Sequence, residues 1–280
     1  MEKQDIQSKI TYITKSIEFS SAHYYYIDSW TQEQNNLKFG LCSNKDAHGH
    51  NYVLHVRLKS IPNKLTGMII NLIDLKRILK EKVLIQFDHK NLNLDTPYFK
   101  TILPTTENLC KVIWDLLNDD LFPILDRVLI YELDDFYAYY KGENNMFYMS
   151  RIYSFSASHR LHNPLLSDED NEKIFDKCNN NNAHGHNYKL EVTIKGDIDP
   201  QTGMVFDLVE MDNLINELVV KRLDHKNLHT NVEDLVGIVT TGENLSKYIW
   251  DKLENRFSPA KLHKVKLFET ERNYFEYKGG

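Results

Sequence analysis

The chain contains the same sequence twice, and this constrains its fold more than any other feature. Four separate words return at a constant offset of 136 residues, a register that low-complexity sequence cannot produce. They are DAHGHNY at 46–52 with NAHGHNY at 182–188, TGM at 66–68 and 202–204, DHKNL at 88–92 and 224–228, and IWD at 113–115 and 249–251. The repeat predicts a tandem duplication with domains 1–143 and 144–280, whose short linker favours packing of the halves against each other.

The apolar pattern predicts the same elements in each copy. The strands expected in the second copy are 147–159, 187–195, 264–270 and 274–278. The expected helices begin after Asp207 and Thr241 in the second copy and lie near 72–84 and 107–117 in the first. Glu210 follows Asp207 at capping-box spacing. Each copy should therefore be an α+β domain, a four-stranded antiparallel sheet with two helices on one face.

Composition excludes several classes of protein. Of the 280 residues, 41% are hydrophobic and 26% are charged, as in soluble globular proteins. No apolar run is long enough to span a bilayer, and the start MEKQD resembles neither a secretory signal nor a transit peptide, so we expect a cytoplasmic protein without a membrane partner. The net charge of −6 argues against nucleic acid. Three cysteines are too few for a disulfide framework.

Three histidines recur in each copy, in positions that suggest a metal site. They are His23, His48 and His50 in the first copy and His159, His184 and His186 in the second. The H-x-H pairs stand where a strand begins, and alternation puts both rings on its apolar face with Cα atoms about 6.6 Å apart. A lone histidine is more often a hydrogen-bonded structural residue, but the repeated trio favours a metal. Three imidazoles with an open position are typical of catalytic zinc, so we expect one Zn²⁺ per domain.

Cysteines accompany both trios. Cys42 and Cys178 each lie six residues before the first histidine of the H-x-H pair. This spacing leaves two roles equally open. Each cysteine could be a fourth zinc ligand, or a thiolate beside the metal that acts as base or nucleophile. Cys110 has a serine at the matching position, Ser246, and is expected in the core.

Acidic residues complete the candidate sites. The adjacent pairs Asp88–His89 and Asp224–His225 have the composition of an acid–base relay, although the same words could form a polar turn. Glu132 and Glu269 fall on the apolar face of a strand, where a carboxylate needs a partner. That partner is either a cation of the sheet or a ligand with two parallel N–H donors.

Together these words resemble the 6-pyruvoyltetrahydropterin synthase family. Beside the words above, both copies contain YKG and a cysteine six residues before HGHNY, the second contains LDHKNL, and the first contains TTEN. The resemblance covers nearly all of both copies and implies two tandem tunnelling-fold (T-fold) domains. The implied reaction is a lyase step of tetrahydrobiopterin biosynthesis, in which 7,8-dihydroneopterin triphosphate becomes 6-pyruvoyl-tetrahydropterin and triphosphate is eliminated. The implied assembly is a homo-oligomer, three fused chains forming a ring.

The resemblance also implies roles for particular residues. The two trios would hold zinc, and Cys42 or Cys178 would be the general base. The Asp-His pairs would relay protons and, in this family, come from a neighbouring domain. The residues that would bind the pterin are Glu132 and Glu269 with Thr105, Thr106, Glu107, Thr241 and Glu243.

Departures from the family pattern concern mainly the first copy. It reads HYYY at 23–26 where the second reads HRLH at 159–162, and ELDD at 132–135 where the second reads ETER at 269–272. These changes make the first site more acidic, which disfavours a triphosphate. Two alternatives remain. One is the related 6-carboxytetrahydropterin synthase activity on the same substrate, and the other is a zinc-stapled, non-catalytic module in which cysteine closes the metal shell.

Overall fold

The computed structural model of the protein describes residues 9–143 and 145–280. Residues 1–8, with which the first predicted domain begins, and residue 144, with which the second begins, lie outside the described part. The chain divides into two compact units. The first contains the described residues up to Met149 together with Gly196–Val205, and the second contains Ser150–Lys195 and Phe206–Gly280. The loop Gly196–Val205, from the second half of the sequence, therefore packs with the first unit.

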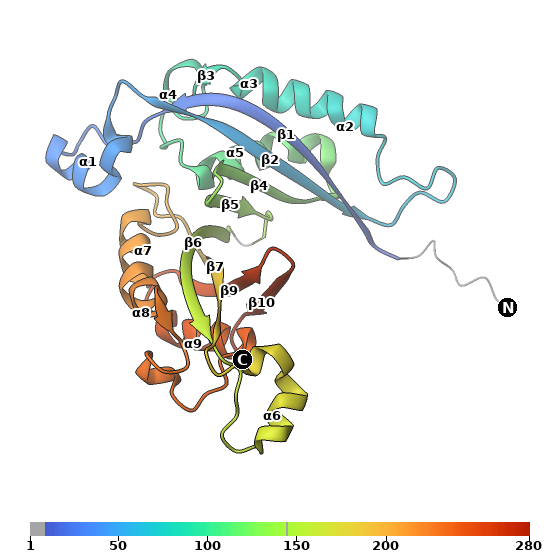
Figure 1. Cartoon of the computed structure of the whole chain (residues 1–280). Coiled ribbons are helices and arrows are strands. Elements are labelled where there is room, and N and C mark those ends of the chain that lie inside the picture. The colour runs from blue at the N-terminus through green and yellow to red at the C-terminus, as the bar shows by residue number, and fades with distance from the viewer. Residues whose placement is uncertain (1–8, 144) are drawn as a thin grey trace. The chain divides into compact units, whose positions relative to one another are not determined.

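The first unit is built on one sheet (Figure 1). Its strands are β1 (Thr11–His23), β2 (His48–Ser60), β3 (Lys90–Asn91), β4 (Leu125–Leu133) and β5 (Phe136–Tyr140). Their order is β5-β4-β2-β1-β3, antiparallel except for β3, which runs parallel to β1. One face of β2 is apolar and fully buried, because Tyr52, Leu54, Val56 and Leu58 alternate with residues that face the other side.

The first unit contains the helices α1 (Gln32–Phe39), η2 (Gly40–Ser43), α2 (Leu72–Leu79), η3 (Lys80–Leu84), α3 (Ile85–Phe87), α4 (Leu92–Asp95) and α5 (Thr106–Leu121). Helix α5 and the helical segment α2–α3 pack on the apolar face of the sheet, whereas α1 and η2 lie beyond the ends of β1 and β2. Helix α5 packs on β4 and β5 and buries Leu109, Ile113 and Leu117. Cys110 lies on the same helix face and is also buried. The packing of α5 holds its N-terminus in place at the site described below.

The second unit repeats this arrangement. Its strands are β6 (Phe147–His159), β7 (His184–Gly196), β8 (Lys226–Asn227), β9 (Lys261–Thr270) and β10 (Asn273–Tyr277). Their order is β10-β9-β7-β6, and β8 runs parallel to β6. The helices are α6 (Asp168–Phe175), η4 (Asp176–Asn179), α7 (Leu208–Ile215), η5 (Asn216–Val220), α8 (Lys221–Leu223), η6 (Glu233–Leu235) and α9 (Gly242–Leu253).

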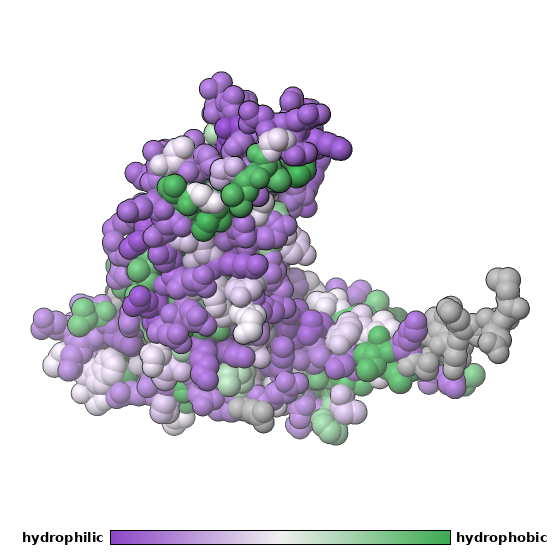
Figure 2. Space-filling view, turned by 90° about the horizontal axis from the view of Figure 1, so that it is seen from below, coloured by the Kyte–Doolittle hydropathy of each residue, from purple (hydrophilic) through white to green (hydrophobic). Residues whose placement is uncertain are grey.

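The mixed α+β prediction is confirmed, and so are both expected helix starts of the second copy. Asp207 caps α7 and accepts a hydrogen bond from the backbone of Glu210, and Thr241 caps α9. The structure adds the short parallel strands β3 and β8 and the helices α1 and α6. The face seen in Figure 2 is mostly hydrophilic. Within the described ranges no helix has the length and hydropathy needed to cross a bilayer.

Candidate active site

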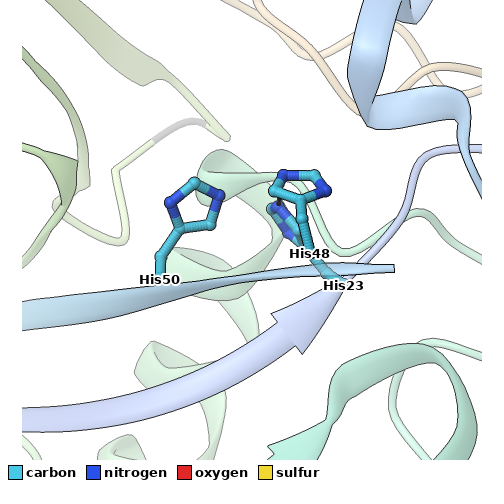
Figure 3. Close-up of side chains that lie close together, drawn as sticks. All are labelled: His23, His48 and His50. Atoms are coloured by element: carbon cyan, nitrogen blue, oxygen red, sulfur yellow. Dashed lines mark hydrogen bonds between the residues drawn. The ribbon is translucent and has the colours of Figure 1, made fainter. Parts of the chain in front are cut away.

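The three histidines of the first copy meet where the β1–β2 ladder ends (Figure 3). His23, the last residue of β1, lies opposite His48, the first residue of β2, and His50 lies opposite Ser21. Each ring offers one nitrogen, and these three nitrogens lie within 4.8 Å of one another. The arrangement can hold one metal ion.

Hydrogen bonds determine which nitrogen of His23 faces the other two histidines. Its Nδ1 donates to the carbonyl oxygen of Pro104 at 3.2 Å, which leaves the lone pair of Nε2 directed at Nε2 of His48, 3.1 Å away. Burial, and secondarily the charge of His48, lowers the pKa of His23 to about 3, so its ring is neutral at neutral pH. The buried Nε2 of His50 has no hydrogen-bond partner in the described part of the chain. Neutral, converging nitrogens of this kind fit a bound cation.

The second copy repeats the trio. His159 Nδ1 donates to the carbonyl oxygen of Thr240 at 2.8 Å, and its Nε2 lies 3.2 Å from Nε2 of His184. Burial lowers the pKa of His159 to about 4. Among the residues described, the buried Nε2 of His186 lacks a hydrogen-bond partner. The ligand nitrogens of this trio also lie within 4.8 Å of one another, so the residues present fit a second cation.

Both cysteines lie outside the trios. In the described ranges, the only groups of three or more metal-ligating atoms within 4.8 Å of one another consist of the histidines. Cys42, in η2, is partly buried, and burial followed by the charge of Glu132 raises the pKa of its thiol to about 11. Cys178, in η4, is partly exposed. A conserved local contact holds each cysteine backbone, since Tyr25 N–H donates to Cys42 O and Leu161 N–H to Cys178 O.

Glu132 of β4 lies beside the first trio. Its side chain is 8% exposed, and its Oε1 lies 3.6 Å from Nε2 of His50. Its Oε2 accepts hydrogen bonds from the hydroxyls of Tyr25, at 3.4 Å, and Thr106. The predicted core-facing carboxylate is therefore next to the histidine trio, and hydroxyls of its own chain already contact it.

Glu269 of β9 has the matching position in the second copy but different neighbours. Its Oε1 lies 3.6 Å from Nε2 of His159 and 3.8 Å from Nε2 of His186. Gly242 stands where the first copy has Thr106, and a Cβ atom there would lie 2.0 Å from a ring carbon of Phe275. The ring of Phe275 therefore occupies the space that a threonine side chain would need, and the second copy has no counterpart of the Thr106 hydroxyl that contacts Glu132.

The N-terminus of α5 contacts the loop from the second half of the sequence. Thr105 caps the helix, and its hydroxyl donates to the carbonyl oxygen of Gly203 at 2.7 Å. Glu107 is buried, and its Oε1 accepts the backbone N–H of Val205 at 3.1 Å. Burial is the largest cause that raises the pKa of Glu107, to about 7. A side chain at Gly203 would meet Asn108, whose Nδ2 lies 2.3 Å from the Cβ position.

The N-terminus of α9 is more open. Thr241 caps the helix through the backbone N–H of Asn244, and Glu243 is exposed. The first-copy loop that matches the loop at 203–205 is also exposed, with Leu65 97% and Met68 44% exposed. The predicted pterin-binding residues of the second copy are thus less enclosed than those of the first.

Neither Asp-His pair contributes a ligand atom to a trio. His89 Nδ1 is 3.0 Å from Asp88 Oδ1, and His225 Nδ1 is 2.8 Å from Asp224 Oδ2. Both histidines have positive φ, 56° and 55°, a sparsely populated conformation for residues with a side chain. His89 lines a cavity of about 510 Å³ together with His50, and His225 lines one of about 550 Å³ together with His186.

Each aspartate is also tied to the backbone. Asp88 accepts the N–H of Ser20, and Asp224 accepts that of Ser156; these bonds are the largest cause that lowers the pKa of each aspartate. Both histidine side chains are 83% exposed. The carboxylates hold the imidazoles in an accessible position.

Both copies match the same known protein family. The sequence model of the family described as 6-pyruvoyl tetrahydropterin synthase matches residues 12–143 and again 148–280. The chain belongs to the 6-pyruvoyl tetrahydropterin synthase family. The predicted family and the predicted class of enzyme, a lyase, are therefore confirmed.

Individual relatives each match about half of the chain. The 6-pyruvoyl tetrahydrobiopterin synthase of Homo sapiens is 50% identical over 131 residues, which cover 47% of this chain and 90% of that protein. The Dictyostelium discoideum enzyme of the same name is 48% identical over 133 residues, covering 47% and 95%. A solved structure, the Caenorhabditis elegans 6-pyruvoyl tetrahydropterin synthase, shares 45% identity, covers 48% of this chain and 96% of its own, and has a TM-score of 0.46. The 6-carboxy-5,6,7,8-tetrahydropterin synthase of Haemophilus influenzae is 25% identical over 152 residues, covering 47% and 99%.

Sequence reasoning missed several residues at these sites. Tyr52 is fully buried, and its hydroxyl lies 3.1 Å from Nδ1 of His23; Tyr188 has the matching position in the second copy. Their recurrence in the repeated HGHNY word was a signal for both. The contact of Tyr25 with Glu132 had no such signal, because the second copy has Leu161 at that position.

Proposed function

We propose that the protein is a zinc-dependent 6-pyruvoyltetrahydropterin synthase with one zinc in each of the domains 1–143 and 144–280. It would convert 7,8-dihydroneopterin triphosphate to 6-pyruvoyl-tetrahydropterin, with elimination of triphosphate, in tetrahydrobiopterin biosynthesis. One observation carries the proposal. Each copy places a trio of imidazoles with converging nitrogens next to a carboxylate on the apolar face of the sheet, and the nearby thiol is not part of the trio.

The residues of the second copy suggest the following roles. His159, His184 and His186 would hold zinc, which when bound supplies Lewis acidity toward the side-chain hydroxyls of the substrate. Glu269 would accept two parallel N–H groups of the pterin ring and so fix its orientation. With the ring fixed, the substrate side chain extends toward the trio, which lies within 4 Å of this carboxylate.

Proton movements would involve the remaining residues. As a thiolate, Cys178 would remove a proton from carbon of the substrate side chain, and triphosphate would leave with the electron pair of its C–O bond. Asp224–His225 would return a proton to the ring. The side chain is oxidised while the ring is reduced, so no external oxidant or reductant is required. In the first copy the same roles would fall to Cys42 and Asp88–His89.

The contacts of α5 support a homo-oligomer. Within the first unit, the loop at 203–205 covers the N-terminus of α5 through Thr105 and Glu107. The repeated sequence contains a second loop and a second helix N-terminus of the same kind, namely the exposed loop at 67–69 and the open N-terminus of α9. We infer that the loop at 67–69 of one chain docks on α9 of another chain and encloses Thr241 and Glu243. Repetition of this contact generates a ring, and the family resemblance sets its size at three chains.

Product analysis tests the proposed reaction. Purified, zinc-loaded protein is incubated with 7,8-dihydroneopterin triphosphate, and the pterins and triphosphate are identified by mass spectrometry. We expect a pyruvoyl side chain and one triphosphate per turnover. Formation of a carboxylate with acetaldehyde would instead assign the protein to the 6-carboxytetrahydropterin synthase reaction.

The cysteine variants distinguish catalysis from a structural metal site. We expect Cys178→Ala to retain two zinc ions per chain and to lose most turnover, whereas Cys110→Ala, at a buried cysteine distant from both trios in sequence, serves as the control. Loss of one zinc from Cys178→Ala would show that the thiol is a ligand, and the non-catalytic module would then be favoured.

A further inference from the structure

A cluster of positive charges lies on the first unit's sheet, on the face opposite the helices. Arg57 of β2 and Arg127 of β4 are directly paired in register, and both alternate with the buried apolar residues of their strands. Lys141 follows β5 on the same side of the sheet. Arg57 forms an ion pair with Asp126, and its side chain is 26% exposed. We call Arg57, Arg127 and Lys141 the cation cluster.

Aromatic rings, rather than carboxylates, contact most of this cluster. Arg127 lies over Tyr139 with its guanidinium carbon 5.6 Å from the ring centre, and Lys141 Nζ lies 4.9 Å from the centre of Tyr148. These two rings stack on each other with their centres 4.3 Å apart. An aromatic face holds a cation in place without cancelling its charge. The rings therefore fix the positions of the cluster and leave its positive field intact.

In the second copy, carboxylates neutralise the cations on the matching face of the sheet. Lys264, which matches Arg127, binds Glu191 at 2.7 Å and lies 3.9 Å from Glu276. Lys278, which matches Lys141, binds Glu276 at 2.8 Å. In the first copy, the positions of these two glutamates are occupied by His55 and Tyr139. The first copy therefore lacks both carboxylates but has cations at the matching positions, together with Arg57, where the second copy has Thr193.

The remaining charges near the cluster do not restore the balance. Asp126 and Glu143 are the acidic groups that act on the two cations held by aromatic rings, whereas the members of the cluster repel one another. Burial, and next the charge of Arg57, lowers the pKa of Arg127; burial also lowers that of Lys141. The buried Nε of Arg127 has no hydrogen-bond partner among the described residues.

We propose that the cation cluster of the first copy binds a multiply charged phosphate anion. Guanidinium groups match the geometry of phosphate oxygens, and two arginines with one lysine provide several donors around a single anion. An anion there would also relieve the repulsion among the three cations. The site uses neither histidine trio, and it does not depend on the proposed lyase reaction.

Calorimetric titration of the intact, zinc-loaded chain with inorganic triphosphate tests this site. We expect saturable binding that weakens as salt is added, because screening reduces the attraction between the anion and a partly exposed cluster. Arg127→Ala should weaken this binding about tenfold, the loss of one charge-assisted contact. The matched control is Lys264→Ala, which removes a cation that two glutamates already neutralise and should change affinity less than about twofold.

A second variant tests the site without removing any member of the cluster. His55→Glu places beside Arg127 the carboxylate that Glu191 provides in the second copy, where the same kind of sheet accommodates it. We expect this variant to fold, to retain both zinc ions and pterin turnover, and to lose the triphosphate site. Binding that is absent in the natural protein, or whose affinity and number of sites per chain are unchanged in both Arg127→Ala and His55→Glu, would overturn the proposal, whereas triphosphate bound at the catalytic sites as product remains in both variants. An equal loss in Lys264→Ala would do the same, because it would show a diffuse charge effect.

Discussion

The two copies contain the same histidine trio, but different residues surround the carboxylate beside it. In the first copy, Glu132 is 8% exposed and accepts hydrogen bonds from Tyr25 and Thr106. In the second, Glu269 is 17% exposed and lies near two histidines of its trio. A carboxylate that already accepts hydrogen bonds from its own chain has fewer lone pairs available to accept hydrogen bonds from a ligand. The comparison indicates that the second copy is the better prepared to bind a pterin.

Two linked substitutions explain much of this difference. The first copy has Thr106 on α5 facing Ala138 on β5, and the second has Gly242 on α9 facing Phe275 on β10. Phe275 fills the space where a threonine side chain would stand. Small and large residues have thus been exchanged across the same helix–strand contact, which preserves packing while it changes the polarity next to the carboxylate.

Removal of a metal ligand from one copy at a time should have the largest effect. We expect His50→Ala and His186→Ala each to lower the zinc content from two ions per chain to one, because two imidazoles with an open shell bind zinc weakly. His186→Ala should lower turnover by at least about a hundredfold, and His50→Ala by far less, since the second copy would perform most of the catalysis. Zinc content by mass spectrometry and initial rates provide the measurements. Similar losses of turnover in both variants would contradict the asymmetry.

The buried Glu107 should make stability depend on pH. Its folded-state pKa is about 7 against an ordinary value of 4.5, so the folded state binds more protons between these pH values and stability falls as pH rises through this window. The total corresponds to about 3 kcal/mol at roughly 1.4 kcal/mol per pKa unit. Glu107→Gln should abolish this fall, as measured by urea unfolding at pH 4.5 to 8 with zinc and protein concentrations fixed.

The matched control for this measurement is Glu169→Gln. Glu169 on α6 is exposed and belongs to neither candidate site, so its replacement should leave the pH profile of the natural protein unchanged. A Glu107→Gln profile parallel to that of the natural protein would show that Glu107 is not responsible for the slope.

The contact between Gly242 of α9 and Phe275 of β10 predicts a smaller effect on stability, in which the two residues are coupled. Gly242→Thr should destabilise the protein by about 2 kcal/mol, because the new Cβ would overlap the ring of Phe275. Addition of Phe275→Ala should recover part of this loss, whereas Phe275→Ala alone should cost packing energy. A double-mutant cycle by urea unfolding measures the coupling, expected at about 1 kcal/mol or more. Additive effects of the two substitutions would show that the residues vary independently.

Sequence alone predicted the trios because repetition and strand alternation act together. His48 and His50 stand two residues apart in β2, and the ladder pairs His48 with His23. Only these long strands were needed to bring the three rings together. Glu132 was predicted for a similar reason, since a carboxylate in phase with Val128 and Ile130 must face the buried side.

Other features could not be read from the sequence because they depend on polar contacts. Helices α1 and α6 have few apolar residues, so their sequences lack the hydrophobic periodicity that would predict a helix. They are held instead by buried Asn35 and Asn171, whose amides bind backbone carbonyls of the preceding loops. The contacts of the loop at 203–205 with Thr105 and Glu107 join distant positions through hydrogen bonds, and such contacts leave no periodic signal.

The smallest expected effect is also the most direct test of why the copies differ. Tyr25→Leu gives the first copy the residue that the second has as Leu161, and it removes one hydroxyl from Glu132. In a Cys178→Ala background, where only the first copy can turn over substrate, we expect KM to fall about threefold, equivalent to the gain of one weak hydrogen bond to the pterin. Tyr25→Phe should give the same change if the hydroxyl is responsible. A gain with Tyr25→Leu but not with Tyr25→Phe would instead implicate the size of the ring, and no gain with either would mean that Thr106 alone occupies the carboxylate.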